Sequence, residues 1–317
     1  MRFKGLGALV LSATVIGLIV PGAALAAKPG ATTGAAANVT FQSARVNGSA
    51  DPNNEPTNYY FQYGTTIALG TETTPTPAGG GANPVRVSTD LAGLAPQTQY
   101  HYRIVAQNAS GTTVGQRRSF TTRRQPLGVS LAATPNPIPF GKSTVLAGTL
   151  TGTGNGGRRI VLQANPWPYT QGFQNATNEQ VTNAQGGFSF PVLPVYVPFN
   201  VQYRVQMPER PAVVSPIVAV GVKPYVKTRI GKRRVKRGRR VRFSGSVRPG
   251  RDGAQIAIQK KRGSTWVTIG GTVVRSGGSY SKRVKIRRGG TFRVWTGVAD
   301  AQYTSNHGRS VRIRSFR

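Results

Sequence analysis

The sequence predicts an all-β protein built from three tandem β-sandwich domains. Its 317 residues include 40 Gly and 22 Pro, a composition typical of many short strands joined by turns. Beyond residue 26 no stretch shows convincing helical periodicity, whereas several segments alternate apolar and polar residues as strands do. The length that remains suits two or three domains of ordinary size.

Residues 1–26 have the pattern of a secretory signal peptide. Arg2 and Lys4 precede an apolar run, Pro21 interrupts it, and the triplet 24–26 reads Ala-Leu-Ala. A membrane anchor is the alternative, but the run is too short to span a bilayer comfortably. We expect cleavage after Ala26, export, and no stable transmembrane insertion. The product is expected to be secreted or extracellular, or retained non-covalently at the cell surface.

Cysteine is absent, which excludes a disulfide framework, a cysteine-bearing metal site and a lipid-attachment cysteine. Residues 27–37 are rich in small side chains and are expected to form a flexible lead. The first domain is then predicted over residues 38–122. Within it, the segment "QYHYRIVAQNASG" alternates as a half-buried strand followed by a turn.

This segment resembles the fibronectin type III module. The matching positions are Leu94, Pro96, Thr98, Tyr100, Tyr102, Ile104, Ala106, Asn108 and Gly111. The resemblance implies a β-sandwich in which Tyr100 is the tyrosine-corner residue, with its hydroxyl bonded back to the chain. The domain has no Trp, so the tryptophan usual in strand B of this family is missing and the core must be packed differently.

An internal repeat covers the remainder of the chain. Residues 141–166 align with residues 238–262, and this alignment pairs Gly148 with Gly245. Further along, Gly186 and Phe188 correspond to Gly278 and Tyr280. The two halves, residues 126–222 and 223–317, resemble the tandem immunoglobulin-like sandwich domains of secreted bacterial proteins.

The tract "GKRRVKRGRRVRF", residues 231–243, is the most basic part of the chain. Val241 and Phe243 alternate with Arg240 and Arg242, and a period of two is that of a strand. The tract is therefore predicted to be a folded hairpin entering a sandwich, with its turn near residues 236–239, and not a disordered arm.

Positive charge is concentrated in the last domain. From residue 223 onward there are 27 Lys and Arg against two Asp, a net charge of +25. Such a surface repels itself and attracts phosphate polymers in a salt-dependent way. The predicted polyanion-binding residues are Arg240, Arg242, Arg283, Lys285, Arg287, Arg293, Arg312 and Arg314. The alternative is that a solvated strand face must be polar, and that base composition and solubility alone explain the arginines.

The predicted partner is an anionic cell-wall polymer or another polyanion. A secreted module that binds nucleic acid or acidic polysaccharide is the alternative, and an accessory domain protein of a carbohydrate-active system is a third. A protein or glycan partner is also expected on the first two domains. Trp266, Trp295 and Tyr303 could stack on bases or sugars, although such residues usually serve the core or its rim.

The sequence contains no complete motif of a known enzyme class. The segment "FGKST" ends like a phosphate-binding loop, but Asn136 stands where that motif needs Gly. The motifs G-x-S-x-G and H-E-x-x-H are absent, the two His residues lie on different domains, and the eight carboxylates are scattered singly. We therefore predict no catalysis, no metal and no cofactor. The expected function is that of a structural or adhesive surface protein.

Overall fold

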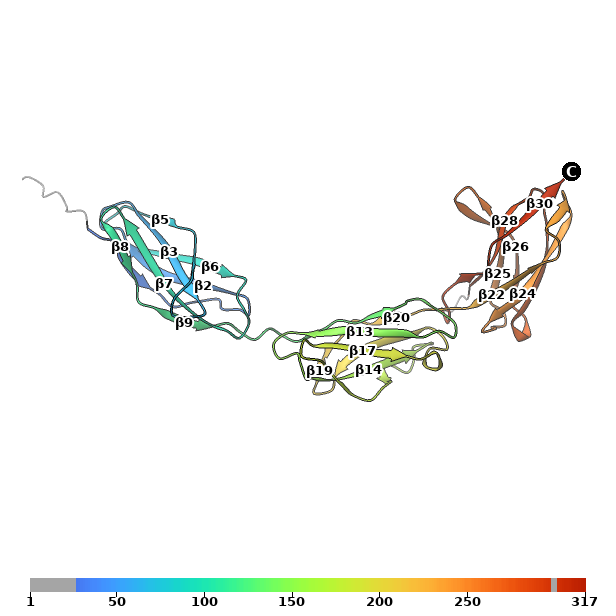
Figure 1. Ribbon diagram of the computed structural model, residues 1–317, viewed down its shortest axis with the longest axis horizontal. Coiled ribbons are helices and arrows are strands. Elements are labelled where there is room, and N and C mark those ends of the chain that lie inside the picture. The colour runs from blue at the N-terminus through green and yellow to red at the C-terminus, as the bar shows by residue number, and fades with distance from the viewer. Residues whose placement is uncertain (1–26, 298–300) are drawn as a thin grey trace, which may run out of the picture. The chain divides into compact units, whose positions relative to one another are not determined.

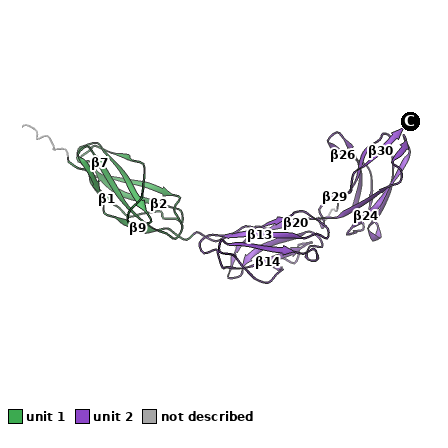
Figure 2. Ribbon diagram, viewed as in Figure 1, with its two compact units in different colours: residues 1–124 green, residues 125–317 purple. Residues whose placement is uncertain are grey.

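The computed structural model is built almost entirely of β-strands and describes residues 27–297 and 301–317 (Figure 1). The expected signal peptide lies outside the described residues. Contacts divide the chain into two units, residues 1–124 and residues 125–317 (Figure 2). The prediction of an all-β fold with several β-sandwiches is confirmed.

The first unit is a sandwich of two sheets. One sheet has the strand order β1-β2-β6; the other has the order β4-β3-β7-β8, with β5 also paired to β3 and β9 to β7. Its strands are β1 Gly30–Thr33, β2 Ser43–Asp51, β3 Thr57–Gly64, β4 Thr71–Glu72, β5 Thr76–Gly79, β6 Val85–Ala92, β7 Gln99–Asn108, β8 Gly111–Val114 and β9 Arg118–Thr121. Side chains from both sheets form one hydrophobic cluster between them.

The expected flexible lead is corrected by the structure. Strand β1 lies inside residues 27–37 and pairs antiparallel with β2, placing Gly30 opposite Asp51. Thr33, at the end of β1, is 3% exposed, and its hydroxyl accepts a hydrogen bond from the Ile104 backbone N–H. Small side chains bury little apolar surface, so the sequence suggested a linker. In the structure these residues form an edge strand, because backbone hydrogen bonding between strands does not depend on side-chain size.

Two tyrosines of β7 anchor the first sandwich. The Tyr100 hydroxyl accepts a hydrogen bond of 2.9 Å from the Ala95 backbone N–H, which is the bond back to the chain that the resemblance implied. The fully buried Tyr102 donates its hydroxyl to Gly34 O at 2.7 Å. Phe61 is also fully buried, and Phe120 stacks on Tyr100 at 5.7 Å between ring centroids. These aromatic rings fill a core that contains no tryptophan.

Replacing Tyr100 with Phe should destabilise the first unit. The ring would keep its packing, but the Ala95 N–H would lose its acceptor, which costs about 1–2 kcal/mol of unfolding free energy. Calorimetry of residues 27–317 should show a lower melting temperature for one transition only. Tyr60→Phe, on the half-buried outer side of β3, is the matched control and should melt like the parent chain. Equal melting of both variants would contradict a tyrosine-corner role.

The first sandwich of the second unit pairs β10-β13-β11, with β17 also on β13, and β15-β14-β18-β19, with β16 on β14 and β20 on β18. Its elements are β10 Gly128–Val129, β11 Ala132–Thr134, β12 Ile138–Pro139, β13 Thr144–Thr151, β14 Arg159–Pro166, β15 Gln174–Asn175, β16 Gln180–Val181, β17 Gly187–Val192, η1 Pro194–Tyr196, β18 Val201–Met207, β19 Arg210–Val214, β20 Val218–Val220 and β21 Val222–Lys223. A separate hydrophobic cluster forms its core.

The last sandwich pairs β22-β24-β27 in one sheet and β23-β30-β28-β25-β26 in the other, with β29 also on β28. Its elements are β22 Tyr225–Ile230, β23 Arg234–Lys236, β24 Arg240–Arg248, β25 Gln255–Arg262, β26 Thr265–Val273, η2 Ser276–Gly278, β27 Ser279–Lys285, β28 Gly290–Gly297, β29 Asn306–His307 and β30 Val311–Phe316. Its core cluster includes the fully buried Phe243 and the nearly fully buried Phe292.

The glycine pair of the repeat occupies equivalent places in the two sandwiches. Gly148 lies opposite Phe188 in the β13–β17 pair, and Gly245 lies opposite Tyr280 in the β24–β27 pair. In both, the glycine lets a backbone carbonyl come close: an added Cβ would lie 2.0 Å from Ser130 O at the first site and 1.8 Å from Lys227 O at the second. The register of the strands thus agrees with the repeat read from the sequence.

Two details of the expected organisation are corrected. The expected boundary between residues 222 and 223 falls inside β21, which pairs in parallel with β12 of the preceding sandwich. The basic tract is folded as expected, but it is not a hairpin, because β23 and β24 belong to different sheets. Strand β23 pairs in parallel with the distant β30, so the turn at residues 236–239 carries the chain from one sheet to the other.

Candidate polyanion-binding surface

The outer side of the β22-β24-β27 sheet carries a continuous set of cationic side chains. In β24, Val241 and Phe243 are buried while Arg240 and Arg242 are exposed, as the alternation predicted. The same period applies to the neighbouring strands, because side chains that face away from the core of a sandwich meet solvent. We call this surface the basic face. Its residues are Lys227, Arg229, Arg240, Arg242, Arg248, Arg283 and Lys285.

Strand register places like charges directly opposite one another on the basic face. Arg240 is paired with Lys285, and Arg242 with Arg283. Side chains at such positions lie about 5 Å apart at Cβ, and like charges there are destabilising. Arg242 Nε donates a hydrogen bond of 2.9 Å to Ser281 Oγ, a neutral partner that leaves its charge uncompensated. An anion that lay across both pairs would relieve this repulsion.

Three members of the basic face were missed by the sequence analysis. Lys227 and Arg229 belong to β22, where they lie opposite Ser246 and Ser244 of β24, and Arg248 ends β24 opposite Tyr225. The signal was present, since "YVKTRI" alternates Lys and Arg with Val, Thr and Ile. The pairing of β22 with β24 could not be predicted from this local pattern.

The eight predicted residues do not form one surface. Arg240, Arg242, Arg283 and Lys285 lie on the basic face, whereas the other four lie elsewhere: Arg293 on β28, Arg312 and Arg314 on β30, and Arg287 in the turn after β27. Strands β28 and β30 belong to the opposite sheet, so their outward side chains face away from the basic face. A single flat polymer that covers the basic face therefore cannot also contact Arg293, Arg312 and Arg314.

Arg293 is held by its own domain. Its guanidinium lies 4.3 Å from the ring centroid of Trp266, and its Nε donates a hydrogen bond of 2.8 Å to Gln259 Oε1. Burial lowers the pKa of Arg293 below its usual value. These contacts hold the side chain on its own sheet and give both it and Trp266 a structural role. Arg293 is therefore the weakest of the eight candidates.

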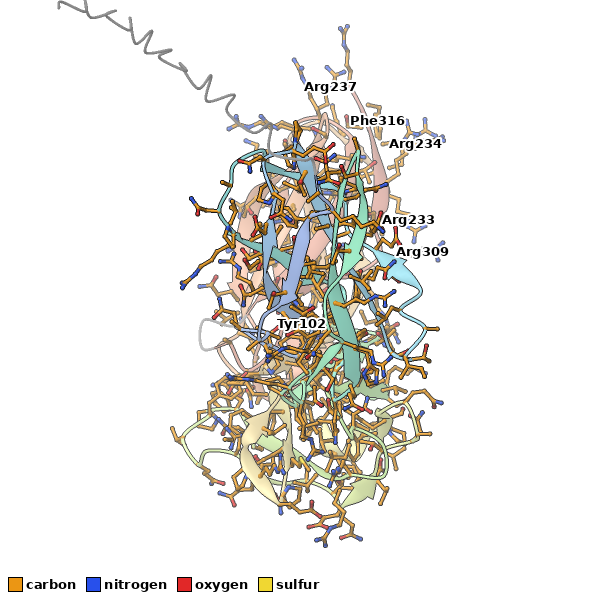
Figure 3. All side chains as sticks on the ribbon, turned by 90° about the vertical axis from the view of Figure 1, so that its left-hand side faces the viewer. Tyr102, Arg233, Arg234, Arg237, Arg309 and Phe316 are labelled. Atoms are coloured by element: carbon orange, nitrogen blue, oxygen red, sulfur yellow. The ribbon has the colours of Figure 1, made fainter. Side chains whose placement is uncertain are left out.

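Another group of arginines gathers around the C-terminal strand. The Arg237 backbone N–H bonds to Phe316 O at 2.8 Å, the Arg314 N–H bonds to Arg233 O at 2.8 Å, and the Arg234 guanidinium lies 5.7 Å from the Phe316 ring centroid. Figure 3 shows the side chains of Arg233, Arg234 and Arg237 extending away from the ribbon near Phe316. The parallel pairing of β23 with β30 produces this group.

Acidic side chains neutralise little of the positive charge of the last sandwich. The ion pairs found among the described residues are those of Arg45 with Asp90, and of Arg159 with Glu179 and Glu209, all in the first two sandwiches. No Asp or Glu occurs in the sequence of β22, β24 or β27. Asp252 lies in the turn before β25, and Asp300 falls outside the described part of the chain.

Within residues 27–297 and 301–317, no three His, Asp or Glu side chains converge in a way that could hold a metal ion. No helix in the described part of the chain is long and apolar enough to cross a membrane. The candidate site is a set of cationic side chains on the outer side of the β22-β24-β27 sheet. Chemically, it can neutralise and orient an anion.

No family model matches the chain, and no curated protein matches it. Among solved structures, a tetra-tandem repeat from the extending region of a large adhesion protein is 13% identical, with a TM-score of 0.33, over 90% of this chain and 74% of that one.

Two further solved structures are similar over most of the chain. Fibronectin domains FN1–FN3 of chicken CNTN1 are 14% identical, with a TM-score of 0.30, over 90% of this chain and all of that one. Three domains of titin are 12% identical, with a TM-score of 0.36, over 92% of this chain and all of that one.

Proposed function

We propose that this is an exported, non-enzymatic modular surface protein, structural or adhesive in role, whose last sandwich binds an anionic cell-surface polymer through the basic face. The first two sandwiches carry contacts to a protein or glycan partner. Export is proposed from the pattern of residues 1–26.

One observation carries the polymer proposal. Arg240 opposes Lys285 and Arg242 opposes Arg283 on strands that contain no acidic residue. A solvated face needs polar side chains, but it does not need like charges in register, because alternating signs would solubilise it equally and stabilise the sheet. A linear polyanion would neutralise the successive pairs along the strand direction and release counterions as it did so.

Retention on purified cell walls tests the proposal. Residues 27–317 should bind walls that retain their anionic polymers, and binding should fall steeply as salt rises, because each neutralised cation adds to the salt dependence. Walls stripped of those polymers should retain little protein. Retention that is insensitive to both salt and stripping, or no retention at about 150 mM salt, would contradict the proposal. Equal binding to double-stranded DNA would favour the nucleic-acid alternative.

A further inference from the structure

A groove opens beside the basic face, on the side of the sandwich where the β25–β26 hairpin faces β27 and the turn after it. It has a volume of about 750 Å³. Its floor is apolar, formed by Ile269, Val284, Ile286 and Phe292. Its rim is cationic, formed by Lys260, Arg262, Lys285, Arg287 and Arg288. No carboxylate is among these lining residues.

The two walls of the groove come from segments far apart in sequence. Lys260 and Arg262 lie at the end of β25, while Arg287 and Arg288 lie in the turn between β27 and β28. Lys260 Nζ donates a hydrogen bond of 2.9 Å to Arg288 O and lies 5.7 Å from the Phe292 ring centroid, which joins the two walls. The rim thus brings cations from two segments around one space, and these contacts position Lys260.

Lys260 is repelled by the neighbouring cations of the rim. Burial, together with the neighbouring charges of Arg262 and Arg288, lowers the pKa of this ammonium. Its contacts are a carbonyl dipole and an aromatic face, neither of which carries a full negative charge. A bound anion would favour the charged form of Lys260 and relieve the repulsion within the rim.

We propose that this groove binds a phosphoryl group carried on a larger organic unit such as a phosphorylated sugar or polyol. The phosphoryl oxygens lie among the guanidinium groups of the rim, and the organic part covers the apolar floor. The proposal rests in part on the proposed function, because Lys285 belongs to both surfaces. It goes further by assigning a discrete site and a ligand class.

Charge, geometry and size favour this ligand class. Guanidinium groups from two walls can reach several oxygens of a tetrahedral phosphoryl group, whereas a carboxylate offers two oxygens and one charge. Five cations around one space suit a doubly charged anion. Inorganic phosphate alone would fill little of a groove of this volume, so an organic unit is expected to add affinity through further van der Waals contacts.

Titration of residues 27–317 with small ligands, followed by NMR or calorimetry, tests the proposal. Glucose 6-phosphate should bind more tightly than inorganic phosphate and more tightly than glucuronate, and glucose should not bind. Arg262→Gln and Arg288→Gln should each weaken glucose 6-phosphate binding by about tenfold, through loss of charge-assisted hydrogen bonds. Arg312→Gln, which removes one charge from the outer side of the sheet that contains β25, outside the groove lining, is the matched control and should leave binding unchanged.

The outcomes separate this site from the basic face. If R262Q and R312Q weakened glucose 6-phosphate binding equally, the proposed phosphoryl site would be refuted. It would also be refuted if neither glucose 6-phosphate nor inorganic phosphate bound. Failure of the proposed function would appear instead as absent wall retention, which the small-ligand titration does not measure. Competition by phosphatidate vesicles, reduced by R262Q and R288Q, would support the site and identify a lipid as the phosphoryl source. The absence of such competition, with sugar phosphate still bound, would support a non-lipid source.

Discussion

Replacing Gly245 with Ala is expected to destabilise the last sandwich by about 3 kcal/mol, because the new methyl group has no space. The added Cβ would lie 1.8 Å from Lys227 O and 2.8 Å from the Tyr280 hydroxyl oxygen. Lys227 O belongs to the backbone of the paired strand β22, so relief requires the β22–β24 pair to separate locally. Tyr280 would be displaced with it, and its hydroxyl would lose a bond of 2.9 Å to Lys227 O.

Urea denaturation followed by tryptophan fluorescence measures this effect, since Trp266 and Trp295 both lie in the last sandwich. Gly271→Ala is the matched control: its added Cβ would lie 3.6 Å from Ile256 O, an ordinary contact, and stability should change by less than about 1 kcal/mol. Gly148→Ala should reproduce the large loss in the preceding sandwich, because Ser130 O would lie 2.0 Å from its Cβ. If G245A and G271A unfolded at the same urea concentration, the close approach would be refuted.

Neutralising the two opposed pairs of the basic face should abolish polymer binding without unfolding the domain. The variant replaces Arg240, Arg242, Arg283 and Lys285 with Gln. For a linear phosphate polymer, each lost contact lowers the slope of log affinity against log salt by about 0.7–0.9, so the slope should fall by about 3. The affinity at about 50 mM salt should fall by at least about 100-fold.

The stability of this variant should stay the same or rise, because the like charges removed repel one another across the strand pairs. A variant with Arg86, Arg117, Arg123 and Arg124 replaced by Gln has the same net charge and is the control, since these exposed residues lie in the first unit. Its binding should remain close to that of the parent chain. If both variants lost binding equally, net charge alone would be responsible and the basic face would have no specific role.

Much of the last sandwich could be predicted from local pattern. The alternation of Val241 and Phe243 with Arg240 and Arg242 identified both the strand and its exposed side, because a period of two requires only the geometry of the strand itself. The repeat identified Gly148 and Gly245 as equivalent, and the two strand pairs agree with it.

The candidate site was predicted only in part, because which strands are neighbours is a non-local property. Lys227 and Arg229 join the basic face because β22 pairs with β24, and β23 fails to form a hairpin because it pairs with β30, some eighty residues later. Arg293 looked equivalent to its neighbours until packing placed its guanidinium against Trp266. None of these contacts produces a periodic pattern in the local sequence from which it could be predicted.

By itself the sequence determined the all-β class, the outward placement of most of the cations and their concentration after residue 223, since composition and a two-residue period are local properties of the chain. Only the tertiary structure decided that the predicted cations divide between two sheets, that like charges face one another in register, and that Lys260 lies against Arg288 across a groove. The physical reason is that strand pairing and sheet packing join residues distant in the chain, and the energy of a charge depends on those neighbours.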